Sequence, residues 1–152
     1  MDIDQRLSEL GIVLPDLNPP LAAYVPAVRS GDLLFISGQL PMDEGALAYR
    51  GKVGRELSLA TGQAASRQAA LNCLAVLYSS ITAWEQFSRI IKVTGYIQCE
   101  SDFTEQPQVL NGASQLLEDI FGEAGKHARV AVGVNALPLG AACEVEMVVQ
   151  LR

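Results

Sequence analysis

Arg129 is the residue of this sequence best suited to bind a small anion. It stands in the run from 128 to 135, whose strict alternation predicts a strand with one buried face. The face expected to be buried carries Val130, Val132 and Val134. On the other face Arg129 has only small neighbours, so its planar guanidinium could offer two parallel donors to a carboxylate. The alternatives are an ordinary surface arginine and a structural ion pair with Glu144 or Glu146.

His127 is the only histidine of the chain, so histidine-based triads and multi-histidine metal sites are nearly excluded. No P-loop, dinucleotide-binding, HExxH or GxSxG motif is present either. His127 could act as a general base, although a single histidine just before a strand is more often a surface or capping residue. Cys73 and Cys143 lie on apolar faces and are expected to be small core residues. With Cys99 they make an odd number without a CxxC pair, which suggests neither a disulfide framework nor a zinc site.

The composition indicates a folded protein with little affinity for phosphates. At 152 residues the chain has the length of one domain, and 49% hydrophobic against 18% charged residues argues against disorder. The net charge of −6 has the wrong sign for binding nucleic acids or anionic membranes. The N-terminus lacks a signal-peptide pattern and no stretch approaches the roughly 18 apolar residues of a membrane span, so we expect a cytoplasmic protein. The apolar surplus predicts an oligomer.

The first part of the chain predicts a short helix followed by a hairpin. The segment from Asp4 to Leu10 fits a helix with its apolar residues at helical spacing. Tyr24–Arg29 and Leu33–Gln39 fit two strands that meet at a turn around Gly31. A further short strand is expected near Ala46–Tyr49.

The second part of the chain predicts two helices and three strands. Ser58 to Ala83 has apolar residues at three and four spacing and is the strongest helical pattern, and Gln106 to Phe121 is the second. Ile90–Ile97 and Cys143–Leu151 fit strands, as does the run that carries Arg129. This order predicts an α+β domain in which both helices pack on one side of a mixed sheet.

Several residues stand at spacings typical of a known family. Tyr24 precedes Ser37-Gly38-Gln39 by thirteen positions, and Asn111 follows further along the chain. Arg129 is followed by Leu137-Pro138 after eight positions and by Glu144 after fifteen. From about Tyr24 to the C-terminus the chain therefore resembles the YjgF/RidA family, which is also called the L-PSP endoribonuclease family.

The resemblance implies a chorismate-mutase-like fold, a homotrimer and active sites in the clefts between subunits. It implies that Arg129 clamps the substrate carboxylate and that Glu144 orients a water molecule. The pocket it implies is lined by Tyr24, Ser37, Gly38 and Asn111.

The reaction that the resemblance implies is the hydrolysis of imines and enamines derived from amino acids, such as 2-aminoacrylate. The products are a 2-oxo acid and ammonia, and neither a metal nor an organic cofactor is expected. An imine carbon is already electrophilic, so such a site needs an anion clamp and a positioned water more than a strong nucleophile.

The chain departs from the family pattern beside the arginine. Val130-Ala131 stand where efficient 2-aminoacrylate hydrolases of the family carry Ser-Cys. Ala131 shares the strand face of Arg129, so we expect it to line the substrate pocket. A methyl group in place of a thiol should widen the pocket and favour imines with larger side chains. Residues 1–20 are expected to be an N-terminal extension of a single domain spanning 1–152.

Three functions follow from these residues and the resemblance. The favoured one is a 2-imino acid deaminase, and the second is a non-catalytic regulatory protein that binds a small carboxylate in the same cleft. Both need Arg129, so only turnover separates them. The third, an endoribonuclease, is disfavoured by the charge of −6 and the single histidine. The expected partners are a small carboxylate or imine and further copies of the chain.

Overall fold

The helices and strands follow the predicted order, with some shifted ends. The computed structural model describes residues 2–152. Its helices are α1 (Ile3–Glu9), α2 (Leu59–Ser79) and α3 (Gln106–Phe121), with short 3₁₀ turns at Trp84–Gln86, Gly122–Gly125 and Pro138–Gly140. Its strands are β1 (Ala27–Ser30), β2 (Leu33–Gln39), β3 (Met42–Asp43), β4 (Ala46–Leu47), β5 (Phe87–Gln98), β6 (Ala128–Val134) and β7 (Cys143–Leu151).

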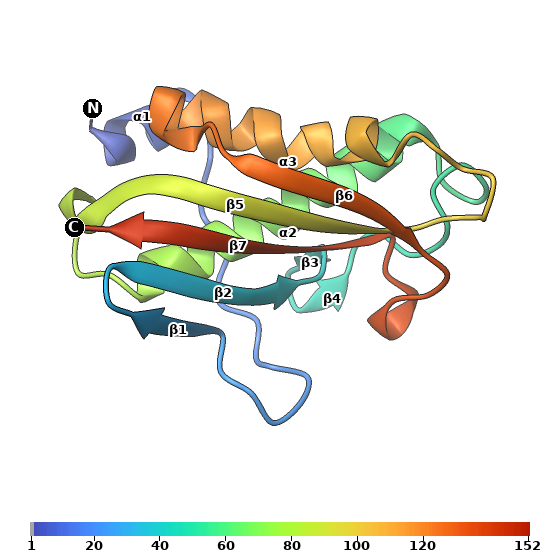
Figure 1. The fold of residues 1–152 in the computed structure, drawn as a ribbon, viewed down its shortest axis with the longest axis horizontal. Coiled ribbons are helices and arrows are strands. Elements are labelled where there is room, and N and C mark those ends of the chain that lie inside the picture. The colour runs from blue at the N-terminus through green and yellow to red at the C-terminus, as the bar shows by residue number, and fades with distance from the viewer. Residues whose placement is uncertain (1) are drawn as a thin grey trace.

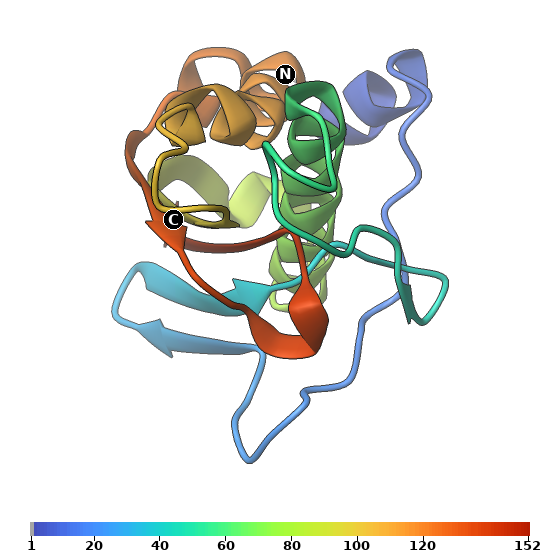
Figure 2. The ribbon, with the colours of Figure 1, turned by 90° about the vertical axis from the view of Figure 1, so that its right-hand side faces the viewer.

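Five of the strands form one mixed sheet in the order β1-β2-β7-β5-β6. The pair β5 and β6 is parallel because α3 carries the chain back between them, and the other neighbours are antiparallel. Figures 1 and 2 show α2 and α3 together on one side of this sheet. The predicted α+β fold with both helices on one side of a mixed sheet is confirmed.

The hydrophobic core lies between the two long helices and the sheet. Ala65, Ala69 and Ala70 are fully buried, and their small side chains let α2 approach the strands closely. All three cysteines are unpaired and buried, and desolvation raises the pKa of the Cys143 thiol to about 12. Cys73 and Cys143 are therefore inert core residues, as their apolar neighbours predict.

The first helix belongs to the same core. Asp2 caps α1 by accepting a hydrogen bond from the Gln5 backbone N–H. Ile3 and Leu7 are buried in the main hydrophobic cluster. Arg6 Nε donates to the Asp119 carbonyl at 2.8 Å, which ties α1 to the end of α3.

Two element boundaries differ from the predicted ones around residue 80. The long helix ends at Ser79 rather than Ala83, and β5 begins at Phe87 rather than Ile90. The hydroxyls of Ser79 and Ser80 both donate to the Val76 carbonyl. Serine side chains that bond local carbonyls compete with the helical ladder, which favours a helix end here.

The strand β6 alternates as predicted, but its covered face is the opposite one. Val130 and Val132 are 42% and 37% exposed, so assigning the valines to the buried face is wrong for this chain. Arg129 pairs in register with Val93, a core residue of β5, and therefore points to the helix side. The helix side of β6 carries Arg129, Ala131 and Gly133, and α3 packs against this side.

The two long helices touch at a glycine. A Cβ on Gly112 of α3 would overlap the carbonyl oxygen of Gln63 in α2. Beside this contact the buried Ser66 hydroxyl donates to the Val109 carbonyl at 2.7 Å and accepts from the Ala113 N–H at 3.1 Å. The helix pair is thus held by close backbone approach and by a buried hydroxyl.

We expect Gly112→Ala to destabilise the fold by about 1–3 kcal/mol, because the added methyl group must push α2 and α3 apart. Helix propensity alone would favour alanine by roughly 1 kcal/mol, so the sign of the change is informative. Thermal unfolding would measure it, with the exposed Gln115→Ala of the same helix as the control. A midpoint equal to or above that of the wild type would show that the helices are not in close contact here.

Candidate functional site

Arg129 lies on the edge strand β6 with its side chain held by α3. Its Nη1 donates to the Ser114 hydroxyl at 3.1 Å and its Nη2 donates to the Pro107 carbonyl at 3.1 Å. These two bonds use two of the five guanidinium N–H groups and leave three for a ligand. The half-buried Arg129 therefore bonds to α3 rather than to Glu144 or Glu146, and the ion-pair alternative is wrong.

A serine and the only histidine stand directly behind this arginine. The Ser114 hydroxyl is 3.0 Å from His127 Nε2, and His127 Nδ1 is 2.6 Å from the Gly125 carbonyl oxygen. A carbonyl only accepts, so Nδ1 carries the proton of the neutral ring and Nε2 accepts from Ser114. Burial lowers the pKa of His127, and the positive charge of Arg129 lowers it further. Both ring nitrogens of this half-buried histidine are thus engaged.

Asn111 and Ala131 lie beside Arg129. Asn111 is exposed on α3, four residues after Pro107 and three before Ser114, so all three share the helix face that meets Arg129. Ala131 follows Arg129 on the same face of β6, as predicted. We call Arg129, Asn111, Ala131, Ser114 and His127 the arginine group.

Tyr24, Ser37 and Gly38 come together near the C-terminal end of β2. The Ser37 hydroxyl donates to the Val25 carbonyl at 2.7 Å, which ties the segment that carries Tyr24 to β2. Tyr24 and Gly38 both line a cavity of about 160 Å³. Two segments that are more than ten residues apart therefore share one small pocket.

Glu144 packs against Gly38 across a β-bulge. Ile36 of β2 pairs with Met147 and Gln39 with Val145, so β2 carries one more residue than β7 in this interval. A Cβ on Gly38 would overlap the Glu144 carboxylate, so glycine is required for this contact. We call Tyr24, Ser37, Gly38 and Glu144 the glutamate group.

The Glu144 carboxyl has a raised pKa. Burial raises its pKa, and the negative charge of Glu146 raises it further. The Tyr96 hydroxyl donates to Glu146 at 2.9 Å, and this hydrogen bond raises the pKa of Tyr96. Two neighbouring carboxylates thus have different surroundings, which is typical of sites where one carboxyl acts as a base.

The arginine and glutamate groups lie on opposite faces of the sheet within one chain. Arg129 is in register with Val93 and Met147 on the helix side, whereas Glu144 is paired with Tyr96 on the open side. Two strand spacings and three residues along the strand separate their backbones, about 10 Å in each direction. One chain therefore does not bring all seven predicted residues into one pocket.

Sequence reasoning missed Ser114 of the arginine group and Tyr96, which donates to Glu146 beside the glutamate group. Ser114 was not singled out, although it stands three residues after Asn111 and must share its helix face. Tyr96 was not singled out either, although its strand places it directly opposite Glu144. In both cases the signal is the position within the element rather than a motif.

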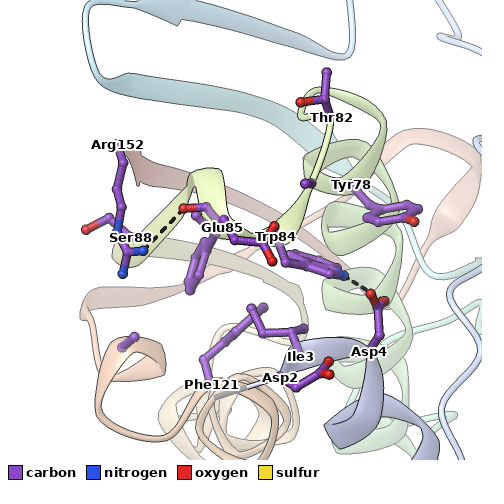
Figure 3. Close-up of a pocket in the computed structure, with 13 residues that line it drawn as sticks. Asp2, Ile3, Asp4, Tyr78, Thr82, Trp84, Glu85, Ser88, Phe121 and Arg152 are labelled. Atoms are coloured by element: carbon purple, nitrogen blue, oxygen red, sulfur yellow. Dashed lines mark hydrogen bonds between the residues drawn. The ribbon is translucent and has the colours of Figure 1, made fainter.

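A separate cavity of about 830 Å³ lies beside α1 (Figure 3). Trp84 Nε1 donates to Asp4 at 3.0 Å at this cavity, and Phe121 forms part of its wall. None of the predicted site residues lines it. Within residues 2–152 there is no group of three or more histidine, cysteine or acidic side chains placed to hold a metal ion. No helix in the same range is long and apolar enough to cross a membrane.

Comparison with known proteins identifies the family. Residues 4–151 match the family model described as "YjgF/chorismate mutase-like, putative endoribonuclease". The chain belongs to this family. Protein TCP17 of Trypanosoma cruzi is 41% identical over 148 residues, which cover 97% of this chain and 92% of TCP17. The YjgF resemblance seen in the residues is therefore confirmed.

Solved structures confirm the YjgF fold. A crystal structure of an Agrobacterium tumefaciens protein is 41% identical, with a TM-score of 0.92 over 99% of this chain and 92% of that one. A "putative endoribonuclease" from Shewanella oneidensis is 34% identical, with a TM-score of 0.96 over 99% and 100%. A stretch of 34 residues, 22% of this chain and 27% of the relative, is 50% identical to the 3-aminoacrylate deaminase RutC of Acinetobacter baylyi.

We expect Arg129→Lys to weaken the binding of a small carboxylate such as pyruvate nearly as much as Arg129→Ala. Lysine is a point charge that cannot donate to Ser114, Pro107 and a carboxylate in one plane. Losing hydrogen bonds to a charged group should cost roughly 10- to 100-fold in affinity. Titration calorimetry would measure it, with Arg67→Lys as the control because Arg67 is an exposed arginine of α2. Wild-type affinity in Arg129→Lys would mean that Arg129 is not the clamp.

Proposed function

We propose that this protein hydrolyses imines and enamines derived from amino acids to 2-oxo acids and ammonia. The observation that carries the proposal is the anchored Arg129 guanidinium, which keeps three donors free beside the small Ala131. An immobilised guanidinium of this kind suits the carboxylate that every 2-imino acid carries. The stretch of identity with a 3-aminoacrylate deaminase supports the same reaction class.

In the proposed reaction Arg129 binds the substrate carboxylate and Glu144 acts on a water molecule. Glu144 accepts a proton as the water oxygen bonds to the carbon of the protonated imine, which gives a neutral carbinolamine. Return of that proton to nitrogen makes ammonia the leaving group. As the C–N bond breaks, the hydroxyl oxygen becomes the carbonyl oxygen of the 2-oxo acid and gives its proton back to Glu144. A buried carboxyl with a raised pKa suits both proton transfers.

The two groups would meet between copies of the chain in a homotrimer. The sheet face away from the helices is uncovered and carries Val28 and Phe35, which are 55% and 47% exposed, together with Val130 and Val132. An apolar face of this kind needs a partner, and the family resemblance favours further copies of this chain. In such an assembly the arginine group of one subunit would face the glutamate group of the next.

A second candidate function is the binding of a small carboxylate without turnover. The observation that favours it is that the arginine group lies within one chain, whereas Glu144 lies on the opposite sheet face. A protein of this kind would report the level of a 2-oxo or imino acid rather than convert it.

The deaminase proposal predicts faster release of ammonia from imines made in place by an amino acid oxidase. Across imines of increasing side-chain size, kcat/KM should rise by about 10-fold or more per added methylene that fits beside Ala131.

Glu144→Gln should lower kcat by about 10²-fold or more, and the exposed Glu123→Gln is the control. The wild-type rate should fall as the pH drops through the raised pKa of Glu144, because only the ionised carboxylate accepts the proton. No acceleration with any imine, while pyruvate still binds, would favour the second candidate.

The assembly predicts a particle of about 49 kDa in light scattering, three times the chain mass of 16.3 kDa. Phe35→Glu should dissociate it, whereas Val13→Glu should not, since Val13 is exposed outside the sheet.

Mixing inactive Arg129→Ala and Glu144→Gln subunits should restore up to about a quarter of the wild-type rate, because a quarter of the shared sites then hold both residues. Mixtures without activity would contradict a shared site.

A further inference from the structure

Ser114 and His127 form a polar chain that ends at Arg129. This inference rests on the proposed function only in that Arg129 binds the substrate carboxylate. We propose that Ser114 and His127 are positioning residues, in which Ser114 holds the Arg129 guanidinium and His127 sets the direction of the Ser114 hydroxyl. Together they would keep the anion clamp ready before the ligand arrives.

The hydrogen bonds of this chain run in a single direction. The Gly125 carbonyl accepts from His127 Nδ1 at 2.6 Å, which leaves Nε2 as an acceptor. Ser114 is 3.0 Å from Nε2 and donates its only proton there. The oxygen of Ser114 is then free to accept from Arg129 Nη1 at 3.1 Å. The donor and acceptor of each hydrogen bond are thus fixed, so removing the histidine acceptor would release the hydroxyl to rotate away.

Holding the guanidinium should matter for affinity. Arginine has many rotamers, and ordering it when a ligand binds would cost conformational entropy. Ser114 and the Pro107 carbonyl hold Nη1 and Nη2 from two turns of α3, so the side chain is already ordered. This arrangement should act mainly on substrate binding, and less on the steps at the imine carbon.

The polar chain from Arg129 through Ser114 to His127 also couples carboxylate binding to the protonation of His127. The charged groups around His127 are Glu118 on α3, Lys126 before it, Arg129 on β6 and Arg89 on β5, which donates to the Lys126 carbonyl. Arg129 opposes a second positive charge at His127, and a bound carboxylate would neutralise that opposition. A protonated Nε2 would donate to Ser114, which could still accept from Arg129.

The sign of the resulting pH dependence follows from this coupling. The pKa of His127 is lowered in the free protein and should rise when a carboxylate sits on Arg129. Binding then takes up a proton, so affinity should increase as the pH falls through the pKa that His127 has in the complex. Pyruvate stays ionised throughout this range and serves as the probe.

The first test measures pyruvate binding and imine hydrolysis at pH 8 in the full chain. Ser114→Ala should raise the Kd and the KM roughly tenfold with a much smaller change in kcat. Ser79→Ala is the matched control, because its helical hydroxyl bonds only to the Val76 carbonyl. Thermal unfolding of both variants separates positioning from stability. Unchanged affinity in Ser114→Ala, or a loss matched by partial unfolding, would overturn the proposal.

The second test compares pyruvate binding between pH 8 and pH 5.5. Wild-type affinity should rise by roughly threefold or more, because binding takes up a proton at His127. His127→Gln keeps an acceptor for Ser114 but does not titrate, so it should bind more weakly at pH 8 and lose this part of the rise. Glu144→Gln measures how much of any remaining rise comes from Glu144. A full rise in His127→Gln would overturn the role of His127.

The Arg129→Ala variant separates the two proposals. If it still binds pyruvate as the wild type does, the carboxylate clamp and the proposed function both fail. If Arg129 is required while Ser114→Ala and His127→Gln behave as the wild type, only the positioning roles fail.

Discussion

The alternation of side chains along β5, β6 and β7 is the constraint on which the rest of the structure depends. Successive residues of a strand point to opposite faces, and here the two faces have different surroundings. The helix side needs Val93 and Met147 for the core, which forces their neighbour Arg129 to the same side. The open side receives Tyr96 and Glu144 by the same rule. Shifting one strand by one residue would exchange the two groups and destroy the core.

A half-buried cation on the helix side must be solvated by the protein. The carbonyl of Pro107 and the hydroxyl of Ser114 do this from α3, and His127 completes the chain. All three groups are neutral when the histidine is unprotonated. Burial lowers the pKa of His127 and so favours this neutral form. The guanidinium is therefore oriented without being neutralised, so its charge stays available to a ligand. A carboxylate partner in the same place would have oriented Arg129 equally well and removed that charge.

Much of this arrangement could be predicted from the sequence, and the failures have definite causes. The strong periodicities of 58–83 and 143–151 located their elements, and the spacing from Arg129 to Glu144 indicated the family. The covered face of β6 could not be predicted, because valine on one face and alanine with glycine on the other are both apolar. The bulge at Gly38 depends on where the Glu144 carboxylate lies, which is a tertiary contact. Ser114 depends on how α3 is rotated against β6, and the sequence of α3 alone does not specify that rotation.

Keeping Arg129 and Glu144 on opposite faces has a chemical consequence. Opposite charges close together in one chain would pair during folding, and breaking a half-buried ion pair to admit a substrate would be costly. Here Glu144 instead lies against Gly38, where burial and then a second carboxylate keep its pKa raised, while Arg129 bonds to neutral groups. Arg129 thus keeps its positive charge and Glu144 keeps a high proton affinity, the two properties that the proposed hydrolysis needs, before the two side chains face one another. Association of subunits would then bring together an unneutralised cation and a proton-accepting carboxyl, with the ligand carboxylate between them to bind the cation.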